Sequence, residues 1–360
     1  MDYSLVCTHC GTRYSNKLKL FRCDKCSSIL EVSYKYPSKI KLAGEKITHV
    51  RYKALFPLHS KLLTLREGGT PSVSYKLDGV NLHLKLETHN PTNSFKDRGS
   101  SIEISKAKEL GFKEVCCAST GNMGLSTAAY AEKFGLKCHI FISKDANKKK
   151  IEKIKKRGAE IVEVEGDFNT ALETAELFAK ENGVFLCGDY HYRKEGQKSI
   201  AYELVEQSAK PLDFIFLPVG NGTLLAAVFK GLNEFKRFGL LRKLPRLVAV
   251  QAKGCNPLVR AFKDHVRIKY QHPKTIADAI AVGYPTFGFE GLEALKKTNG
   301  IAVSIKDEEL LSVKKKLAIT GILAESGGTA AFAGFLKLYK EHPMRFKNKN
   351  VACIITGNNE

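Results

Sequence analysis

The chain has 360 residues, of which 43% are hydrophobic and 26% are charged, and its formal net charge is +21. This composition is that of a globular protein with a substantial core, and it excludes disorder on a large scale. The charge alone would permit nucleic-acid binding, but the lysines are scattered. The densest run, residues 148–157, keeps Ile151 and Ile154 at helical spacing, as in a solvated helix face. We therefore expect no nucleic-acid partner.

The chain has no segment with the roughly 20 apolar residues that a membrane span needs. Residues 1–20 carry charged side chains in place of an apolar leader region. We therefore expect a cytoplasmic protein without membrane contact. The ten cysteines agree with a reducing compartment, because four of them have the spacing of metal ligands and the other six fall in apolar runs.

The four N-terminal cysteines form two CxxC pairs with twelve residues between them, Cys7 with Cys10 and Cys23 with Cys26. This spacing predicts a tetrahedral zinc site between strand-like segments at 12–14 and 29–34. A site closed by four sulfurs leaves no open coordination position, so the expected role of the zinc is structural.

Beyond a basic connector, the pattern changes to alternating strands and helices. A turn at 67–72 precedes a strand at 81–86, and a helix follows that Ser94 and Asp97 would cap and that Gly111 would end. The alternation continues with strands at 115–118, 137–142, 160–164 and 184–187 and helices at 125–134, 148–156 and 169–181. It resumes with strands at 214–217, 247–251, 301–304 and 351–355 and helices at 200–207, 224–236, 307–319 and 328–339. Regular βα alternation predicts parallel sheets with helices on both faces, in two α/β domains.

The segment NPTNSFKDRG places Lys96 in the first turn of a helix. The helix dipole and the nearby Arg98 both disfavour an ammonium there, and a neutral amine is what a lysine needs to condense with an aldehyde. Taken alone, the segment is equally compatible with an ordinary helix start and a solvated lysine.

Three loops follow predicted strands at the sheet edge where ligands of open α/β sheets bind. In ASTGNMG, backbone N–H groups with the Ser119 and Thr120 hydroxyls would suit a carboxylate, and the Asn122 amide would suit a phenolic oxygen. In VGNGT, two glycines before a helix would let backbone amides surround a phosphate. The third loop delivers Thr356, whose hydroxyl can bond a ring nitrogen without holding it protonated.

Lysine, phosphate loop, amide and hydroxyl together make up the inventory of a pyridoxal phosphate site. The segments NPTNSFKDRG, CASTGNMG, YRKEGQKS, PVGNGTL, VQAKGCNP and TIADAI, with the terminal TG, occur in the order seen in threonine synthases. The chain thus resembles that family of fold type II (tryptophan synthase beta-like) pyridoxal phosphate enzymes, many of which are similar in having an N-terminal zinc ribbon.

The resemblance implies a zinc ribbon at 1–35, a large cofactor-binding α/β domain at 36–98 and 190–360, and a small α/β domain at 99–189. It implies a lyase that forms threonine and phosphate from O-phosphohomoserine and water, and a homodimer is the expected assembly. Lys96 would be the Schiff-base lysine and catalytic base. The implied cofactor contacts are Asn122 with the phenolic oxygen, Thr356 with the ring nitrogen, and Gly220, Asn221, Gly222, Thr223 and Leu224 with the phosphate. The implied substrate contacts are Ser119 and Thr120 with the carboxylate and Arg193 with the phosphate.

The chain departs from the family pattern around the substrate. Met123 and Gly124 stand where GNTS would provide hydroxyls, the pattern NSxNPxR is replaced by one with Cys187, Gly188 and Tyr190, and the terminal TGxGLK is reduced to TGNNE. A phosphate with fewer donors is bound less tightly. A related β-eliminating or β-replacing enzyme, such as a threonine or serine dehydratase or a cysteine or cysteate synthase, is therefore the alternative activity. A basic zinc-ribbon binding protein without catalysis is the alternative from another class.

Overall fold

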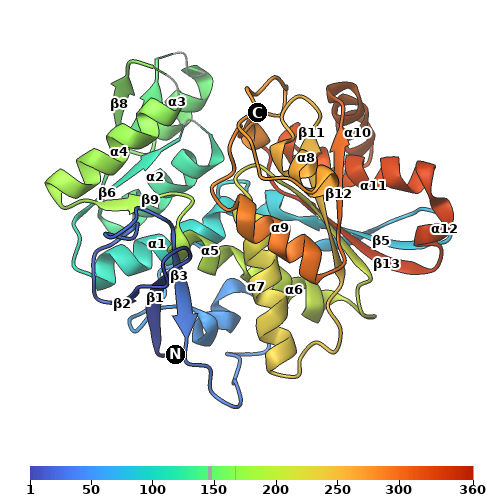
Figure 1. Ribbon diagram of the computed structural model, residues 1–360, viewed down its shortest axis with the longest axis horizontal. Helices are drawn as coiled ribbons and strands as arrows, with labels where there is room; N and C mark the ends of the chain where they lie inside the picture. Colours follow the sequence, from blue (N-terminus) through green and yellow to red (C-terminus); the bar gives the residue numbers. More distant parts are fainter. Residues whose placement is uncertain (120, 145–147, 167, 360) are drawn as a thin grey trace. The chain divides into compact units, whose positions relative to one another are not determined.

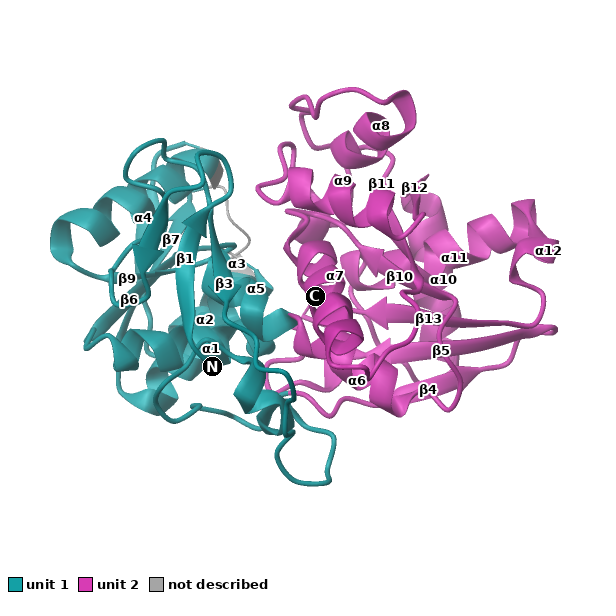
Figure 2. Cartoon of the chain, turned by 60° about the horizontal axis from the view of Figure 1, so that its bottom comes forward, with its two compact units in different colours: residues 1–67, 96–197 teal, residues 68–95, 198–360 magenta. Residues whose placement is uncertain are grey.

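The computed structural model describes residues 1–119, 121–144, 148–166 and 168–359. The described chain divides into two compact units, which Figure 2 colours separately: unit 1 contains residues 1–67 and 96–197, and unit 2 contains residues 68–95 and 198–360. The domain boundaries expected from the sequence stay a prediction.

Unit 1 begins with a small antiparallel sheet of order β2-β1-β3, which carries the four N-terminal cysteines. Its strands are β1 (Tyr3–Cys7), β2 (Arg13–Ser15) and β3 (Leu30–Tyr34), and the 3-10 helix η1 (His49–Leu55) follows. Strands β2 and β3 agree with the predicted segments. Strand β1 was not predicted.

The larger sheet of unit 1 is parallel, with the order β8-β7-β6-β9. Its strands are β6 (Glu114–Ala118), β7 (Lys137–Ser143), β8 (Glu160–Val164) and β9 (Phe185–Cys187), and its helices are α1 (Lys96–Glu109), α2 (Asn122–Phe134), α3 (Lys148–Lys155), α4 (Phe168–Asn182) and α5 (His191–Gln197). Neighbouring residues of β6 face different helices, because the Cys116 thiol donates to the Ala175 carbonyl of α4 and Cys117 lies near Arg193 of α5. Helices thus cover both faces, as predicted.

Unit 2 contains a six-stranded sheet of order β12-β11-β10-β13-β5-β4, parallel except for the edge strand β4 (Figure 1 and Figure 2). Its strands are β4 (Ser72–Tyr75), β5 (Val80–Leu86), β10 (Phe214–Pro218), β11 (Arg246–Ala252), β12 (Ile301–Ile305) and β13 (Lys349–Ile355). Its helices are η2 (Glu87–His89), α6 (Ser199–Gln207), α7 (Thr223–Arg237), α8 (Pro257–Asp264), η3 (Asp278–Ile280), α9 (Gly288–Lys297), α10 (Asp307–Ile319), η4 (Gly327–Thr329), α11 (Ala330–Glu341) and α12 (Pro343–Phe346). Separate apolar clusters on the two faces of this sheet form its core.

The alternation of strands and helices predicted from the pattern is therefore confirmed. The predicted Ser94 cap is wrong, because α1 begins at Lys96 and the buried Ser94 hydroxyl has no hydrogen-bond partner among the described residues. Ser94 instead pairs with Gly357 in an isolated bridge, since the chain is still extended there. The predicted end of α1 is confirmed. Gly111 has a φ of +81° and donates its N–H to Lys108, and Phe112 donates to Ala107.

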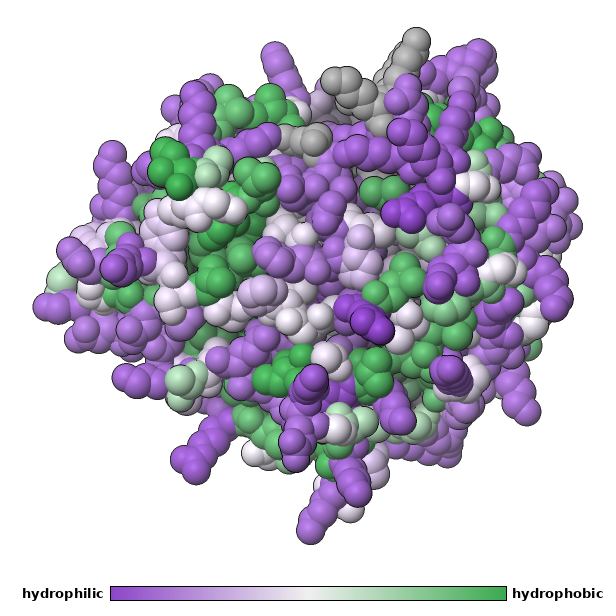
Figure 3. Space-filling model, turned by 180° about the vertical axis from the view of Figure 1, so that it is seen from behind, coloured by the Kyte–Doolittle hydropathy of each residue, from purple (hydrophilic) through white to green (hydrophobic). Residues whose placement is uncertain are grey.

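Polar side chains dominate much of the face shown in Figure 3, with smaller apolar areas between them. This distribution agrees with the scattered lysines of the sequence. None of the helices in the described part of the chain combines the length and apolar character that crossing a membrane requires.

Candidate active site

Lys96 is the first residue of α1, and its side chain keeps 18% of its surface exposed. The start of α1 lies directly against α5. A Cβ at Gly99 would come within 2.5 Å of the Arg193 side chain, and one at Gly196 would come within 1.9 Å of the Arg98 carbonyl oxygen. Only glycine permits these approaches, so the two glycines fix the first turn of α1, and with it the Lys96 backbone, against α5.

Arg193 lies in this contact and is completely buried. Its guanidinium pairs with Glu103, donates to the Lys96 carbonyl at 3.2 Å and the Gly188 carbonyl at 3.1 Å, and lies within hydrogen-bond distance of Ser100 and Thr127. Burial raises the pKa of Glu103 to about 7, and the charge of Arg193 acts in the opposite direction. Arg193, which was predicted to bind a phosphate, is thus paired with Glu103 within unit 1 and fixes the backbone of Lys96 through a hydrogen bond.

Helix α2 is bonded to the same turn of α1. The Ser126 hydroxyl donates to Asp97 at 2.6 Å and lies 2.8 Å from the Ser100 hydroxyl. At the start of α2, Asn122 is its first residue, and Ser119 follows β6 with 8% of its surface exposed. The structure therefore brings the loop after β6 and the lysine helix together within unit 1. The predicted carboxylate ligand Thr120 lies outside the described residues.

In unit 2, the loop after β10 leads into α7 through Gly222, whose φ is +82°. A Cβ at Gly222 would lie 2.7 Å from the Phe287 carbonyl oxygen, and one at Gly220 would lie 3.2 Å from Ile280. The segment TIADAI thus packs against the glycine loop. Thr223 and Leu224 begin α7 and are buried. A helix leaves its first N–H groups without intrahelical acceptors, so this loop offers donors for an anion.

Thr356 follows β13, which pairs in parallel with β10. The glycine loop and Thr356 therefore leave the same sheet edge from neighbouring strands. Thr356 is 5% exposed, and its carbonyl oxygen accepts the N–H of Phe95, the residue before Lys96. The Gly357 carbonyl accepts from the Glu325 N–H, and Asn359 donates to Glu325 and Thr92, so the segment after β13 is fixed within unit 2.

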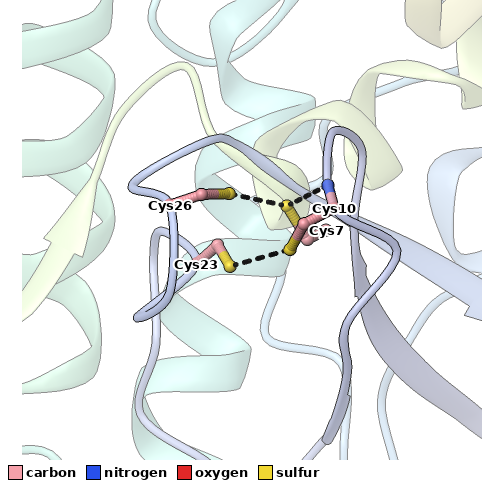
Figure 4. Close-up of side chains that lie close together, drawn as sticks. All are labelled: Cys7, Cys10, Cys23 and Cys26. Carbon is pink, nitrogen blue, oxygen red and sulfur yellow. Dashed lines mark hydrogen bonds between the residues drawn. The ribbon is translucent and has the colours of Figure 1, made fainter.

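The four N-terminal cysteines converge as predicted, with their sulfurs within 4.8 Å of one another (Figure 4). The Cys7 and Cys26 sulfurs are 3.4 Å apart, and those of Cys10 and Cys23 are 3.6 Å apart. Four sulfurs about 2.3 Å from a central ion would be about 3.8 Å apart, so the cluster fits a tetrahedral metal. Hydrogen bonds with Thr12 lower the pKa of Cys10 to about 6, which favours the thiolate that binds metals.

The model of a family described as pyridoxal-phosphate dependent enzyme matches residues 63–357 of the chain. The threonine synthase of Methanosarcina acetivorans is 36% identical, over 99% of this chain and 91% of its own length. That of Methanocaldococcus jannaschii is 35% identical, over 98% of this chain and 91% of its own. The chain belongs to the pyridoxal-phosphate dependent enzymes, in the group that contains the threonine synthases. Among solved structures, a maize serine racemase has the same fold, with a TM-score of 0.72 and 22% identity over 81% of this chain and 88% of its own.

The residues of this pyridoxal-phosphate dependent enzyme fit the cofactor in chemical type. Unit 1 contains an amine at Lys96 and an amide at Asn122, and unit 2 contains a loop with backbone N–H groups before a helix and a hydroxyl at Thr356. The closely packed glycines at 220 and 222 agree with a loop that must bring its backbone to a phosphate.

Sequence reasoning missed two features of the site. It predicted no helix between the strand at 184–187 and the helix at 200–207, whereas residues 191–197 form the buried helix α5. It also missed Asp189, whose carboxylate oxygen lies 3.7 Å from the Lys96 nitrogen. An acidic residue in a segment with no predicted helix or strand carries no signal that could have identified it.

Proposed function

We propose that the protein is a threonine synthase that converts O-phosphohomoserine and water into threonine and phosphate. The main support is the match to threonine synthases along almost the whole chain. The observation from the structure that agrees best is the close packing of α1 on α5, which holds Lys96 in one place at a helix start.

In this proposal Lys96 attaches the cofactor, and later accepts and returns the protons at Cα and Cβ of the substrate. Asn122 bonds the phenolic oxygen of the cofactor, and residues 220–224 bind its phosphate. Ser119 and Thr120 bind the substrate carboxylate, and Arg193 the substrate phosphate. When bound, pyridoxal phosphate supplies an electron sink that stabilises negative charge on the substrate carbons. Thr356 would hydrogen-bond the ring nitrogen without protonating it, because a hydroxyl is too weak an acid to do so.

A β-eliminating relative is the second candidate, and the position of Arg193 favours it. Its guanidinium is buried and paired with Glu103, and Met123 offers no hydroxyl to a second phosphate. Such an enzyme would act on an unphosphorylated hydroxy amino acid.

Substrate turnover separates the two candidates. Incubation with O-phosphohomoserine should release inorganic phosphate and form threonine in equal amounts. Ammonia release from threonine or serine, without phosphate release, would instead establish the β-eliminating activity. Lys96→Ala should abolish both turnover and the visible absorbance of the bound cofactor, and Lys108→Ala, at an exposed position of the same helix, should change neither. A colourless wild-type protein with salt-sensitive RNA binding would establish the non-catalytic alternative.

The four-cysteine cluster is proposed to hold one structural zinc ion. Metal analysis of the purified protein should give one zinc per chain, and Cys23→Ser should lose it. A chelator that removes the metal should unfold the small sheet, because closed zinc sites contribute directly to folding.

We also propose that the enzyme is a cytoplasmic homodimer. Light scattering in solution tests the assembly, and a mass of one chain would contradict it.

A further inference from the structure

Asp189 lies between β9 and α5, with its carboxylate oxygen 3.7 Å from the Lys96 nitrogen. Its side chain is 9% exposed and that of Lys96 is 18% exposed, so bulk water screens the pair only partly. The position matches the unspecified x of the pattern NSxNPxR, so the family resemblance assigns it no role.

We propose that Asp189 is the counter-ion of Lys96 and sets the protonation of its nitrogen during the reaction. This inference rests on the proposed function, in which Lys96 accepts and returns protons. Each time the nitrogen takes up a proton it becomes positively charged, and a fixed carboxylate stabilises that charge without taking the proton itself. Asp189 is therefore a positioning residue that acts through Lys96.

The turn that carries Asp189 is held from one side by the buried pair of α1 and α5. The Gly188 N–H donates to Glu103 at 2.8 Å, and the Gly188 carbonyl accepts from Arg193 at 3.1 Å. The Tyr190 N–H closes the turn by donating to the same carbonyl at 2.7 Å. Both backbone groups of Gly188 are thus fixed, and Asp189 is the next residue.

The cysteine-bearing segment holds the turn from the other side through Tyr190. The Tyr190 ring packs edge-on against Phe21 at 5.8 Å between centroids, and its hydroxyl donates to Glu176 at 2.6 Å. Glu176 also pairs with Arg22 at 2.7 Å. A Cβ at Gly188 would lie 2.9 Å from the Tyr190 ring. Two of the departures from the family pattern, Gly188 and Tyr190, therefore belong together, and they build the turn that presents Asp189.

Among the described residues of unit 1, the ionisable groups within electrostatic range of Asp189 include Lys96, Arg193, Glu103 and Cys117. Arg193 is in direct contact with Glu103, so those opposite charges offset each other. Burial raises the pKa of Cys117 to about 12, so that thiol stays neutral at physiological pH. Of the two cations, Lys96 and Arg193, the Lys96 nitrogen is therefore the one on which the carboxylate acts more directly.

The test is a pH titration of the visible absorbance of the substrate-free holoenzyme, together with steady-state kinetics. Without the carboxylate, the Lys96 nitrogen should lose its proton more readily. Asp189→Asn should therefore move the midpoint of the absorbance change down by about one to three pH units. The value of kcat should fall at least tenfold, with little change in KM. Asp189→Glu should restore most of both values, whereas Asp189→Ser should behave like the asparagine variant.

Asp2→Asn is the matched control, because Asp2 pairs with Lys35 at a similar distance of 3.5 Å but on the exposed surface. It should leave the midpoint and kcat unchanged. An Asp189→Asn enzyme that binds cofactor and keeps the wild-type midpoint would overturn the proposal. The titration uses no substrate, so its outcome does not depend on the reaction. A shifted midpoint without threonine formation would overturn the proposed function alone, and threonine formation with an unshifted midpoint would overturn the role of Asp189 alone.

Discussion

Helix α1, which begins at Lys96, buries many polar and charged side chains, whereas α7, which follows the glycine loop, buries mainly apolar ones. The buried residues of α1 include Asp97, Arg98, Ser100, Ser101, Glu103, Ser105 and Lys106. Those of α7 include Leu224, Leu225, Ala226, Ala227, Val228, Leu232 and Phe235. The comparison teaches that the helix that begins at Lys96 rests on specific hydrogen bonds and ion pairs, while the helix behind the glycine loop rests on ordinary apolar packing. The two helices should therefore respond differently to substitution and to pH.

The largest effect is expected from Arg193→Met, which removes one partner of the buried pair in the α1–α5 contact. Above pH 7 Glu103 would either stay as an uncompensated buried charge or have to take up a proton, so the free energy of unfolding should fall there by about 3 to 5 kcal/mol. Urea denaturation measures this change. If the free energy of unfolding falls by less than about 1 kcal/mol, α1 is stabilised mainly by apolar packing, as α7 is. If the variant folds, a raised KM for O-phosphohomoserine would support the predicted contact of Arg193 with the substrate phosphate.

A somewhat smaller effect is expected from Leu232→Ala in α7. Leu232 is completely buried in the apolar cluster that lies between α7 and the sheet of unit 2. Its truncation should cost about 2 to 5 kcal/mol through lost transfer free energy and a cavity, at every pH. The same denaturation series checks it, and a strong pH dependence would contradict the apolar character assigned to this helix.

The pH dependence itself distinguishes the helices. Burial raises the pKa of Glu103 to about 7 from a value of 4.5 in the unfolded chain, so the folded state binds this proton more tightly. Its contribution to stability is complete below pH 4.5 and is lost as the pH rises toward 7. The slope for a single group is at most about 1.4 kcal/mol per pH unit. Glu103→Gln should flatten the stability curve between these pH values, and unchanged curvature would refute this assignment.

The smallest effect is expected from Lys297→Ala on α9. Lys297 pairs with Glu293 one turn away at 2.6 Å, but both side chains are largely exposed. Exposed pairs of this kind contribute about 0.3 to 0.5 kcal/mol. If the free energy of unfolding falls by more than about 1 kcal/mol, exposed ion pairs such as Lys297–Glu293 stabilise this protein more than expected. The buried pair of α1 would then not be exceptional.

The difference between elements buried by apolar packing and elements buried by polar contacts also explains how much of the fold the sequence could predict. Helix α7 was predicted to within one residue at each end, because apolar side chains recur at helical spacing. Helix α5 was missed, because HYRKEGQ contains no apolar pattern and its burial depends on partners distant in sequence, such as Glu103. The four cysteines were predicted from spacing alone, since metal ligation fixes both residue type and separation.

The positions of the candidate site residues follow the same division. The glycine loop and Thr356 could be predicted because strand ends have local signals. Lys96 was correctly placed in the first turn of a helix, although the Ser94 cap predicted for that helix is wrong. The engagement of Arg193 and the proximity of Asp189 to Lys96 could not, because both depend on a turn formed by residues 188–190 and its tertiary contacts.

The glycine contacts between α1 and α5 limit how this enzyme can be altered. At positions 99 and 196 the two helices meet so closely that even a methyl group has no space. Directed-evolution libraries that aim to change substrate range should therefore leave both codons fixed. Diversity at residues 188–190 would vary the surroundings of the amine while the helices keep their separation.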